Sequence, residues 1–332
     1  MIVGLIATET SSPATANARE IELDGEERAE LTALADRMAR VGSGLVDDPR
    51  WQEQSRSAGA LPGRISSLLR TFRFDPGPEG TALIAGLPLG PAPLPPTPRA
   101  PESFEPRATV PAVLAMLLGN ELGTVIAYRD EKKGSMVQNV VPIPSLAASQ
   151  SNGGSVELDM HTENAFHPHR PDYVGLLCLR SADGDCVGTR VASIRRALPL
   201  LDPATREILH ERRFVTDAPP SFRSSGRSEP SSVLSGMPED PDICVDFHAS
   251  HALDETAGRA LRDLREALVT ARVDVVLRPG DMAFLDNRVV VHGRAPFSPR
   301  YDGRDRWLHR VFVHLNHRRS RRHRPDNGVV LI

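Results

Sequence analysis

Cysteine, aromatic residues and long apolar runs are all scarce in this sequence of 332 residues. Its three cysteines, Cys178, Cys186 and Cys244, form no CxxC pair and are too scattered for a disulfide framework, which favours a reducing, cytoplasmic setting. No apolar run approaches the ~18 residues of a membrane span. The amino-terminal MIVGLIATET has no basic leader before it, so we expect no signal peptide.

Several sequence motifs are also missing. GxGxxG and Walker A sequences and a βαβ alternation are absent, which argues against nucleotide binding. HExxH is absent, and so is the PCxxC that follows HxE in zinc deaminases, so zinc hydrolases and deaminases fit less well. A net charge of −3 gives no general attraction to nucleic acid or anionic lipid. We therefore expect a small-molecule substrate, while the oligomeric state stays open.

The first part of the chain, to about residue 125, reads as a mostly helical flank. Apolar residues at helical spacing predict helices over 26–43, 60–72 and 110–123. Between them, TALIAGLPLG (81–90) reads as a buried strand, and the proline-rich 90–106 as an extended connector. The flank should therefore contribute one early strand to the core.

From about residue 126 the pattern changes to short segments rich in Val, Leu and Ile. These predict strands, with helices over 202–213 and 253–271 and a long loop over 217–241. The strands are expected within 136–143, 155–163, 172–180, 189–194, 243–250, 273–297 and 306–316. The order indicates a mainly β fold, a sandwich or open barrel with a helical flank. We expect a single domain over 1–332, with the core at 126–318 and a solvated basic tail at 319–332.

The segment SVELDMHTE carries unusual polarity for a buried strand. On a strand, Glu157, Asp159, His161 and Glu163 would share one face. Four ionisable groups facing an apolar core would be costly unless a cation neutralised them. Alternatively, the strand lies at the surface and these residues face water. The functional interpretation is that His161 and Glu163 are two ligands of a metal ion.

A third ligand is available in DNRVVVHGR. His292 ends an apolar strand and is followed by Gly293, where the chain enters a loop. A lone histidine is more often structural than metal-binding. Together, however, His161, Glu163 and His292 match the two-histidine, one-carboxylate triad that leaves three positions of Fe(II) open.

Two arginines follow on the last predicted strand. Arg306 and Arg310 would share a face with Leu308 between them. Two inward guanidiniums need anions, so we expect either two carboxylates or one carboxylate and a salt bridge. The alternative is a pair of exposed arginines on an edge strand.

These segments carry a family resemblance. ELDMHTENAFHPHRPDYVGLLCLR, GTRVASIRRALPLLD and DNRVVVHGRAPFSPRYDGRDRWLHR resemble the clavaminate synthase-like Fe(II)/2-oxoglutarate oxygenases, above all the hydroxylases of free L-amino acids such as arginine, asparagine and lysine. The resemblance runs from about residue 80 to 318. It implies a double-stranded β-helix, or jelly roll, as the core fold.

The resemblance also implies roles for individual residues. His161, Glu163 and His292 would hold iron, and Arg306 with Thr189 would bind the distal carboxylate of 2-oxoglutarate. Arg310 would bind the substrate α-carboxylate, with Gln138 and Glu163 as partners of the α-ammonium. The loop 217–241 would close over the substrate.

The substrate side chain is the least determined part of the resemblance. Asp246 falls where relatives place an acid against a basic side chain, although a strand-end turn is the alternative. Relatives that act on arginine and lysine often have a second acid two residues on, where this chain has His248. That departure argues against a strongly cationic side chain and leaves room for a neutral ureido or amide group.

The implied reaction uses Fe(II), 2-oxoglutarate and O2 to hydroxylate C3 or C4 of a free amino acid, releasing succinate and CO2. Because Glu163 is present, halogenation is not expected. Two other hypotheses remain open. One is a desaturase or an oxidase of a larger or carrier-bound metabolite with the same iron site, and the other is a non-catalytic jelly-roll metal-binding protein.

Overall fold

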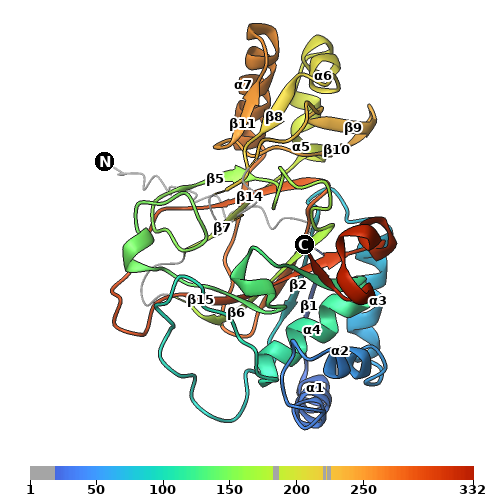
Figure 1. Ribbon diagram of the computed structural model, residues 1–332, viewed down its shortest axis with the longest axis vertical. Helices are drawn as coiled ribbons and strands as arrows, with labels where there is room; N and C mark the ends of the chain where they lie inside the picture. Colours follow the sequence, from blue (N-terminus) through green and yellow to red (C-terminus); the bar gives the residue numbers. More distant parts are fainter. Residues whose placement is uncertain (1–18, 182–186, 220–221, 223–225) are drawn as a thin grey trace, which may run out of the picture.

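Two β-sheets of unequal size form the centre of the fold, which is mainly β with helices (Figure 1). The computed structural model describes residues 19–181, 187–219, 222 and 226–332. The larger sheet has the order β1 (Arg19–Glu22), β2 (Thr81–Ala85), β13 (Met282–Asp286), β6 (Tyr173–Arg180), β15 (Trp307–His314), β3 (Thr124–Tyr128) and β16 (Val330–Leu331), and β4 (Gln138–Val140) also pairs with β15. The smaller sheet has the order β12 (Val273–Val275), β7 (Thr189–Ser193), β14 (Val290–Arg294) and β5 (Leu158–His161).

Four helices from the first part of the chain cover one face of the larger sheet (Figure 1). They are α1 (Gly25–Met38), α2 (Pro49–Ser55), α3 (Gly63–Phe74) and α4 (Val110–Leu122). Their starts follow the expected rules, because Asp24, Asp48 and Thr109 each accept a backbone N–H of the first turn. Within the described residues, no helix has the length and apolarity that a bilayer crossing requires.

The larger sheet is buried on both faces, and its side chains alternate between two cores. On β6, Leu177 and Leu179 pack toward the helices, whereas Val174 and Leu176 pack toward the smaller sheet. This two-residue period is the one that extended strands impose. The strand expected over 172–180 is therefore confirmed, and both of its faces are occupied.

A third group of elements lies beyond the smaller sheet, at the top of Figure 1. Two short antiparallel pairs, β8 with β11 and β9 with β10, pack there beside three helices. The elements are α5 (Ile194–Ala197), α6 (Pro203–Leu209), β8 (Phe214–Thr216), β9 (Leu234–Met237), β10 (Asp240–Ile243), β11 (Ser250–Ala252) and α7 (Glu255–Thr270).

Two sequence expectations in this region are wrong in part. The loop expected over 217–241 ends in the β9–β10 hairpin, whose strands are only four residues long and carry little apolar signal. Residues 220–221 and 223–225 of that loop lie outside the described residues. The strand expected over 243–250 is interrupted, because Asp246 accepts the N–H groups of His248 and Ala249 and closes a turn.

Most basic side chains of the tail are exposed, as the sequence indicated, but the tail is folded against the protein. Ser320 and Arg324 are buried, and Arg324 donates to Ser320 Oγ and to the carbonyls of His317 and Gly328. Beyond them, β16 pairs in parallel with β3. Internal hydrogen bonds and one added strand therefore fold the tail onto the larger sheet.

Buried histidines make the stability of the fold sensitive to acid. Burial lowers the pKa of His309 to about 3, and burial is the main cause that lowers the pKa of His167 and His314 to about 4. Between the ordinary histidine pKa of about 6.5 and these values, the unfolded chain takes up protons that the native state does not. The free energy of unfolding should therefore fall as pH decreases through this window, by up to about 1.4 kcal/mol per pH unit for each histidine.

Denaturant unfolding at pH 7.5 and pH 5 measures this loss. His309→Leu should reduce the difference between the free energies of unfolding at the two pH values. An unaltered pH dependence in His309→Leu would show that His309 does not contribute to acid sensitivity.

Candidate active site

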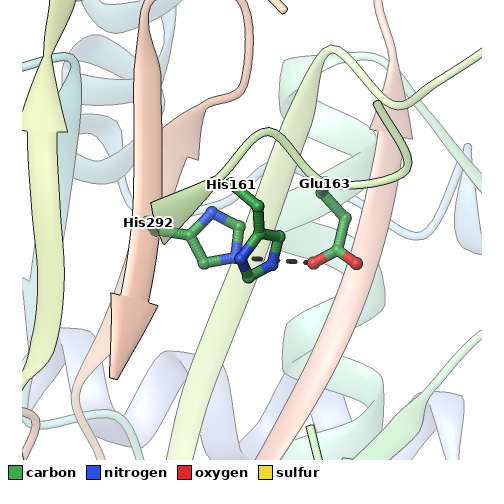
Figure 2. A group of neighbouring side chains, drawn as sticks. All are labelled: His161, Glu163 and His292. Atoms are coloured by element: carbon green, nitrogen blue, oxygen red, sulfur yellow. Dashed lines mark ion pairs between the residues drawn. The ribbon is translucent and has the colours of Figure 1, made fainter. Parts of the chain in front are cut away.

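His161 and His292 lie opposite each other on neighbouring strands. The antiparallel register of β5 and β14 pairs the two residues directly, and their ring centroids are 4.5 Å apart. Figure 2 shows both imidazoles side by side, one from each strand. Strand pairing in the smaller sheet therefore brings together two histidines that are 131 positions apart in the sequence.

Glu163 reaches the same point from a turn and not from the strand. β5 ends at His161, and Asn164 adopts a left-handed backbone with φ of 53°. The turn places Glu163 Oε2 3.5 Å from His292 Nε2 (Figure 2). One ligand atom from each of His161, Glu163 and His292 lies within 4.8 Å of the others, the arrangement that a metal ion requires.

The expectation that four ionisable groups share one strand face is wrong. Because β5 ends at His161, the alternation does not extend to Glu163. Glu157 pairs with Arg190, and Asp159 Oδ1 lies 2.7 Å from Arg265 Nη2, so neither acid is a member of the metal cluster. His161 at the end of β5 and Glu163 in the turn that follows therefore come together without sharing a strand face.

The protonation states around the three ligands suit a cation. Burial alone would raise the pKa of Glu163, but Arg310, His292 and His161 together hold it well below its usual range. Burial and the neighbouring His161 lower the pKa of His292. An ionised carboxylate and neutral imidazoles are the forms that ligate metals.

Arg306 is a buried guanidinium beside this cluster. It precedes β15, is 8% exposed, and donates from Nη2 to Thr189 Oγ1 over 3.3 Å. Among the described residues it forms no ion pair with a carboxylate, and burial lowers its pKa to about 10. A buried cation without a counter-ion is costly, so this end of the cavity is suited to an anion.

Arg310 lies on the same side of β15 as Arg306, as the alternation predicted. Trp307 and His309, on the other side of the strand, line a separate cavity beneath the proline-rich segment. Arg310 donates from Nη1 to Glu163 Oε1 over 3.0 Å and from Nη2 to Gln138 Oε1 over 2.5 Å.

Glu131 is a further member of this group that the sequence analysis missed. It is buried, pairs with Arg310, and its Oε2 has no hydrogen-bond partner. Burial raises its pKa against the opposing effect of Arg310. In the sequence it stands in RDEKKG, which is typical of an exposed turn, so a single sequence offers no signal for its burial.

One cavity, open at its mouth, is lined by the three metal-cluster residues together with Arg306, Arg310, Thr189 and Glu131. Asp246 and His248 stand at its wall, with Asp246 half-buried and His248 exposed. Pro219 and Phe222, from the start of the loop expected over 217–241, also line it, as does Thr216 just before that loop. All nine site residues expected from the sequence border this cavity or, in the case of Gln138, contact Arg310 within it.

Comparisons with known proteins agree with this geometry. The family model "Taurine catabolism dioxygenase TauD, TfdA family" matches residues 112–312. The chain belongs to the TauD/TfdA dioxygenase family. It is 43% identical over 314 residues to L-asparagine oxygenase of Streptomyces coelicolor, covering 94% of both chains. It is 34% identical to clavaminate synthase 2 of Streptomyces clavuligerus, covering 86% of this chain and 89% of that one.

Solved structures extend the comparison to bound ligands. Asparagine oxygenase in complex with Fe(II), (2S,3S)-3-hydroxyasparagine and succinate superposes with a TM-score of 0.91 at 43% identity, covering 94% of this chain and 98% of that one. The non-heme iron oxygenase OrfP with Fe and α-ketoglutaric acid gives a TM-score of 0.85 at 30% identity, covering 94% and 100%. This TauD/TfdA family member is an Fe(II)/2-oxoglutarate-dependent dioxygenase, and the His–Glu–His cluster fits its metal.

Proposed function

We propose that this dioxygenase hydroxylates C3 of a free L-amino acid whose side chain ends in a neutral amide, with L-asparagine as the leading candidate. The observation that carries the proposal is the pairing of a metal cluster with two buried arginines in one cavity. Arg306 has no acidic partner among the described residues, whereas Arg310 stands among acids and an amide. The two arginines therefore suit different ligands.

His161, Glu163 and His292 would hold Fe(II), which would supply a binding position for 2-oxoglutarate and O2 and activate O2, the oxidant for C–H hydroxylation. The fit rests on the donor set of two imidazoles and one ionised carboxylate. Arg306 would bind the distal carboxylate of 2-oxoglutarate through its planar fork, with the Thr189 hydroxyl beside it.

Arg310 would bind the α-carboxylate of the amino acid. Its present partners Glu131 and Glu163 are acceptors, and Glu131 Oε2 is buried without a partner. We assign the α-ammonium mainly to these two acids. Gln138 suits it less than the sequence suggested, because its Oε1 is occupied by Arg310 and its free Nε2 is a donor, which suits the substrate carboxylate.

Asp246 and His248 support a neutral side chain over a cationic one. Asp246 Oδ1 already accepts two backbone N–H groups, and the position two residues on is an exposed histidine. One partly satisfied carboxylate can accept a hydrogen bond from an amide, whereas a buried guanidinium would need fuller charge compensation. The 43% identity to an asparagine oxygenase points the same way.

The position of Glu163 supports attack at C3. One of its oxygens contacts Arg310 Nη1 at 3.0 Å and the other lies 3.5 Å from His292 Nε2, so one carboxylate joins the amino-acid anchor to the metal site. A substrate held by its α-groups would therefore present its first side-chain carbon nearest the metal. Orientation by fixed anchors is how such a site selects one C–H bond.

A substrate panel tests this proposal. We expect L-asparagine to drive succinate release from 2-oxoglutarate and to gain one oxygen atom, with kcat/KM at least about 100-fold above that for arginine or lysine. Mass spectrometry of the product and a succinate assay are the two measurements. Preference for a cationic amino acid would overturn the amide assignment, and loss of two hydrogens would indicate a desaturase. No stimulation by any free amino acid would contradict the function as proposed.

We further propose that the fold is a double-stranded β-helix, with residues 1–332 forming one domain. The larger sheet is shared by both hydrophobic cores, which supports a single unit. The family match and the structural neighbours support the β-helix. We also propose a cytoplasmic enzyme that acts on a free small molecule.

A further inference from the structure

The geometry points to Asn287 as a positioning residue that fixes the metal ligand Glu163. Asn287 lies in the turn between β13 and β14, distant in sequence from Glu163, and is 1% exposed. Its side chain is not a member of the metal cluster and does not line the cavity. It therefore acts on the site through the backbone of the ligand turn.

The side-chain amide of Asn287 pairs with both polar groups of the Glu163 backbone. Its Oδ1 accepts the Glu163 N–H over 2.8 Å, and its Nδ2 donates to the Glu163 carbonyl over 3.1 Å. The second Nδ2 proton goes to the carbonyl of Pro171 over 2.9 Å. The Asn287 amide thus satisfies the backbone N–H and carbonyl of Glu163, which have no strand partner because β5 ends at His161. Its hydrogen bond to Pro171 also fixes the other end of the segment 163–171.

The hydrogen bonds from Asn287 to the Glu163 backbone lie next to a residue in an unfavourable backbone conformation. Asn164, the next residue, holds a left-handed φ of 53°, which a non-glycine residue adopts only when its surroundings favour it. On the other side, Thr162 is paired to Val245 through its backbone N–H and its hydroxyl, at 2.7 and 3.1 Å. The Thr162–Val245 pairing includes a backbone hydrogen bond, whereas both hydrogen bonds from Asn287 to Glu163 come from the Asn287 side chain, so a substitution at Asn287 removes them.

Asn287 is itself rigidly held. Its N–H donates to the Asp172 carbonyl over 2.9 Å, and the fully buried Asp286 before it accepts two hydrogen bonds from Arg288 at its Oδ1. The turn that contains Asn287 is therefore rigid, and it can hold the metal ligand Glu163 in one position. Partners outside the ligand set typically contribute 10- to 100-fold to metal affinity through such orientation.

The test is a Co(II) titration of the full chain without 2-oxoglutarate or amino acid, followed by visible absorption. We expect Asn287→Ala to raise the Co(II) dissociation constant about 10- to 100-fold. Asn287→Asp keeps the shape and the acceptor for the Glu163 N–H but loses the donor to two carbonyls, so it should weaken binding as well. If Asn287→Ala does not fold, the Co(II) dissociation constant of Asn287→Asp tests the positioning role on its own.

Asn139→Ala is the matched control. Asn139 is 3% exposed and also makes two side-chain hydrogen bonds, with Trp307 Nε1 and Ser103 Oγ, away from the metal cluster. Its Co(II) affinity should stay within about threefold of the original chain. Unchanged Co(II) affinity in both Asn287 variants would overturn the positioning role, even if turnover fell. The inference rests on the proposed metal site, and failure of the original chain to bind Co(II) would instead contradict that site.

Discussion

Replacing His292 by alanine is expected to remove metal binding and to abolish 2-oxoglutarate turnover. His292 supplies one of three ligand atoms that lie within 4.8 Å of one another, and two ligands do not define the facial arrangement that a ferrous ion needs. Because outer partners alone contribute 10- to 100-fold, loss of a ligand should lower turnover by more than about 100-fold. Succinate release with saturating iron measures the effect.

The control for this variant is His251→Ala. His251 is exposed and pairs with Asp217, outside the metal cluster. Its turnover should match that of the original chain. Full turnover in His292→Ala would place the iron elsewhere, whereas a chain without turnover in either form would favour the non-catalytic binding protein.

Replacing Arg306 by methionine should weaken 2-oxoglutarate binding while stabilising the chain that has no ligand. Removing one partner of a buried charge pair typically costs about 2–5 kcal/mol, so the dissociation constant should rise by about 30-fold to several thousand-fold. Without the co-substrate, the same guanidinium is buried and unpaired, so an apolar side chain should raise the free energy of unfolding by about 1 kcal/mol or more. The two effects have opposite signs.

Thermal unfolding with and without 2-oxoglutarate and metal measures both effects. At 100 times its dissociation constant, a ligand stabilises by about 2.7 kcal/mol, so the original chain should gain several degrees and Arg306→Met should gain almost none. Arg180→Met is the control, because Arg180 donates to Thr97 and to the Gly303 carbonyl outside the iron cavity. Equal stabilisation of Arg306→Met and the original chain would exclude Arg306 from the co-substrate site.

Hydrophobic periodicity predicted the strands that are buried on two faces. β6 and β15 are buried along almost their whole length. At the start of β15 the alternation correctly separated Arg306 and Arg310 from Trp307 and His309. The same reasoning failed for β5, which is short and ends within the motif. The three side chains that the structure brings together were predicted from residue type and family resemblance, and not from the strand geometry expected for them.

What the sequence could not supply depends on contacts between distant segments. Glu131 is buried beside Lys132 and Lys133, whose left-handed backbone conformations, with φ of 46° and 59°, no local sequence pattern indicates. Asn287 stands in a stretch that reads as an ordinary turn, and only its contact with Glu163 reveals a role. Similarly, the β9–β10 hairpin has two strands of four residues each, and β9 is exposed after Leu234, so it offers little of the apolar alternation on which strand prediction relies.

Anomalous scattering at the iron absorption edge, from crystals grown anaerobically with Fe(II), tests the central claim most directly. We expect one strong peak, within bonding distance of an imidazole nitrogen of His161, a carboxylate oxygen of Glu163 and an imidazole nitrogen of His292. A strong peak away from these three residues, or none in crystals that contain stoichiometric iron, would contradict it.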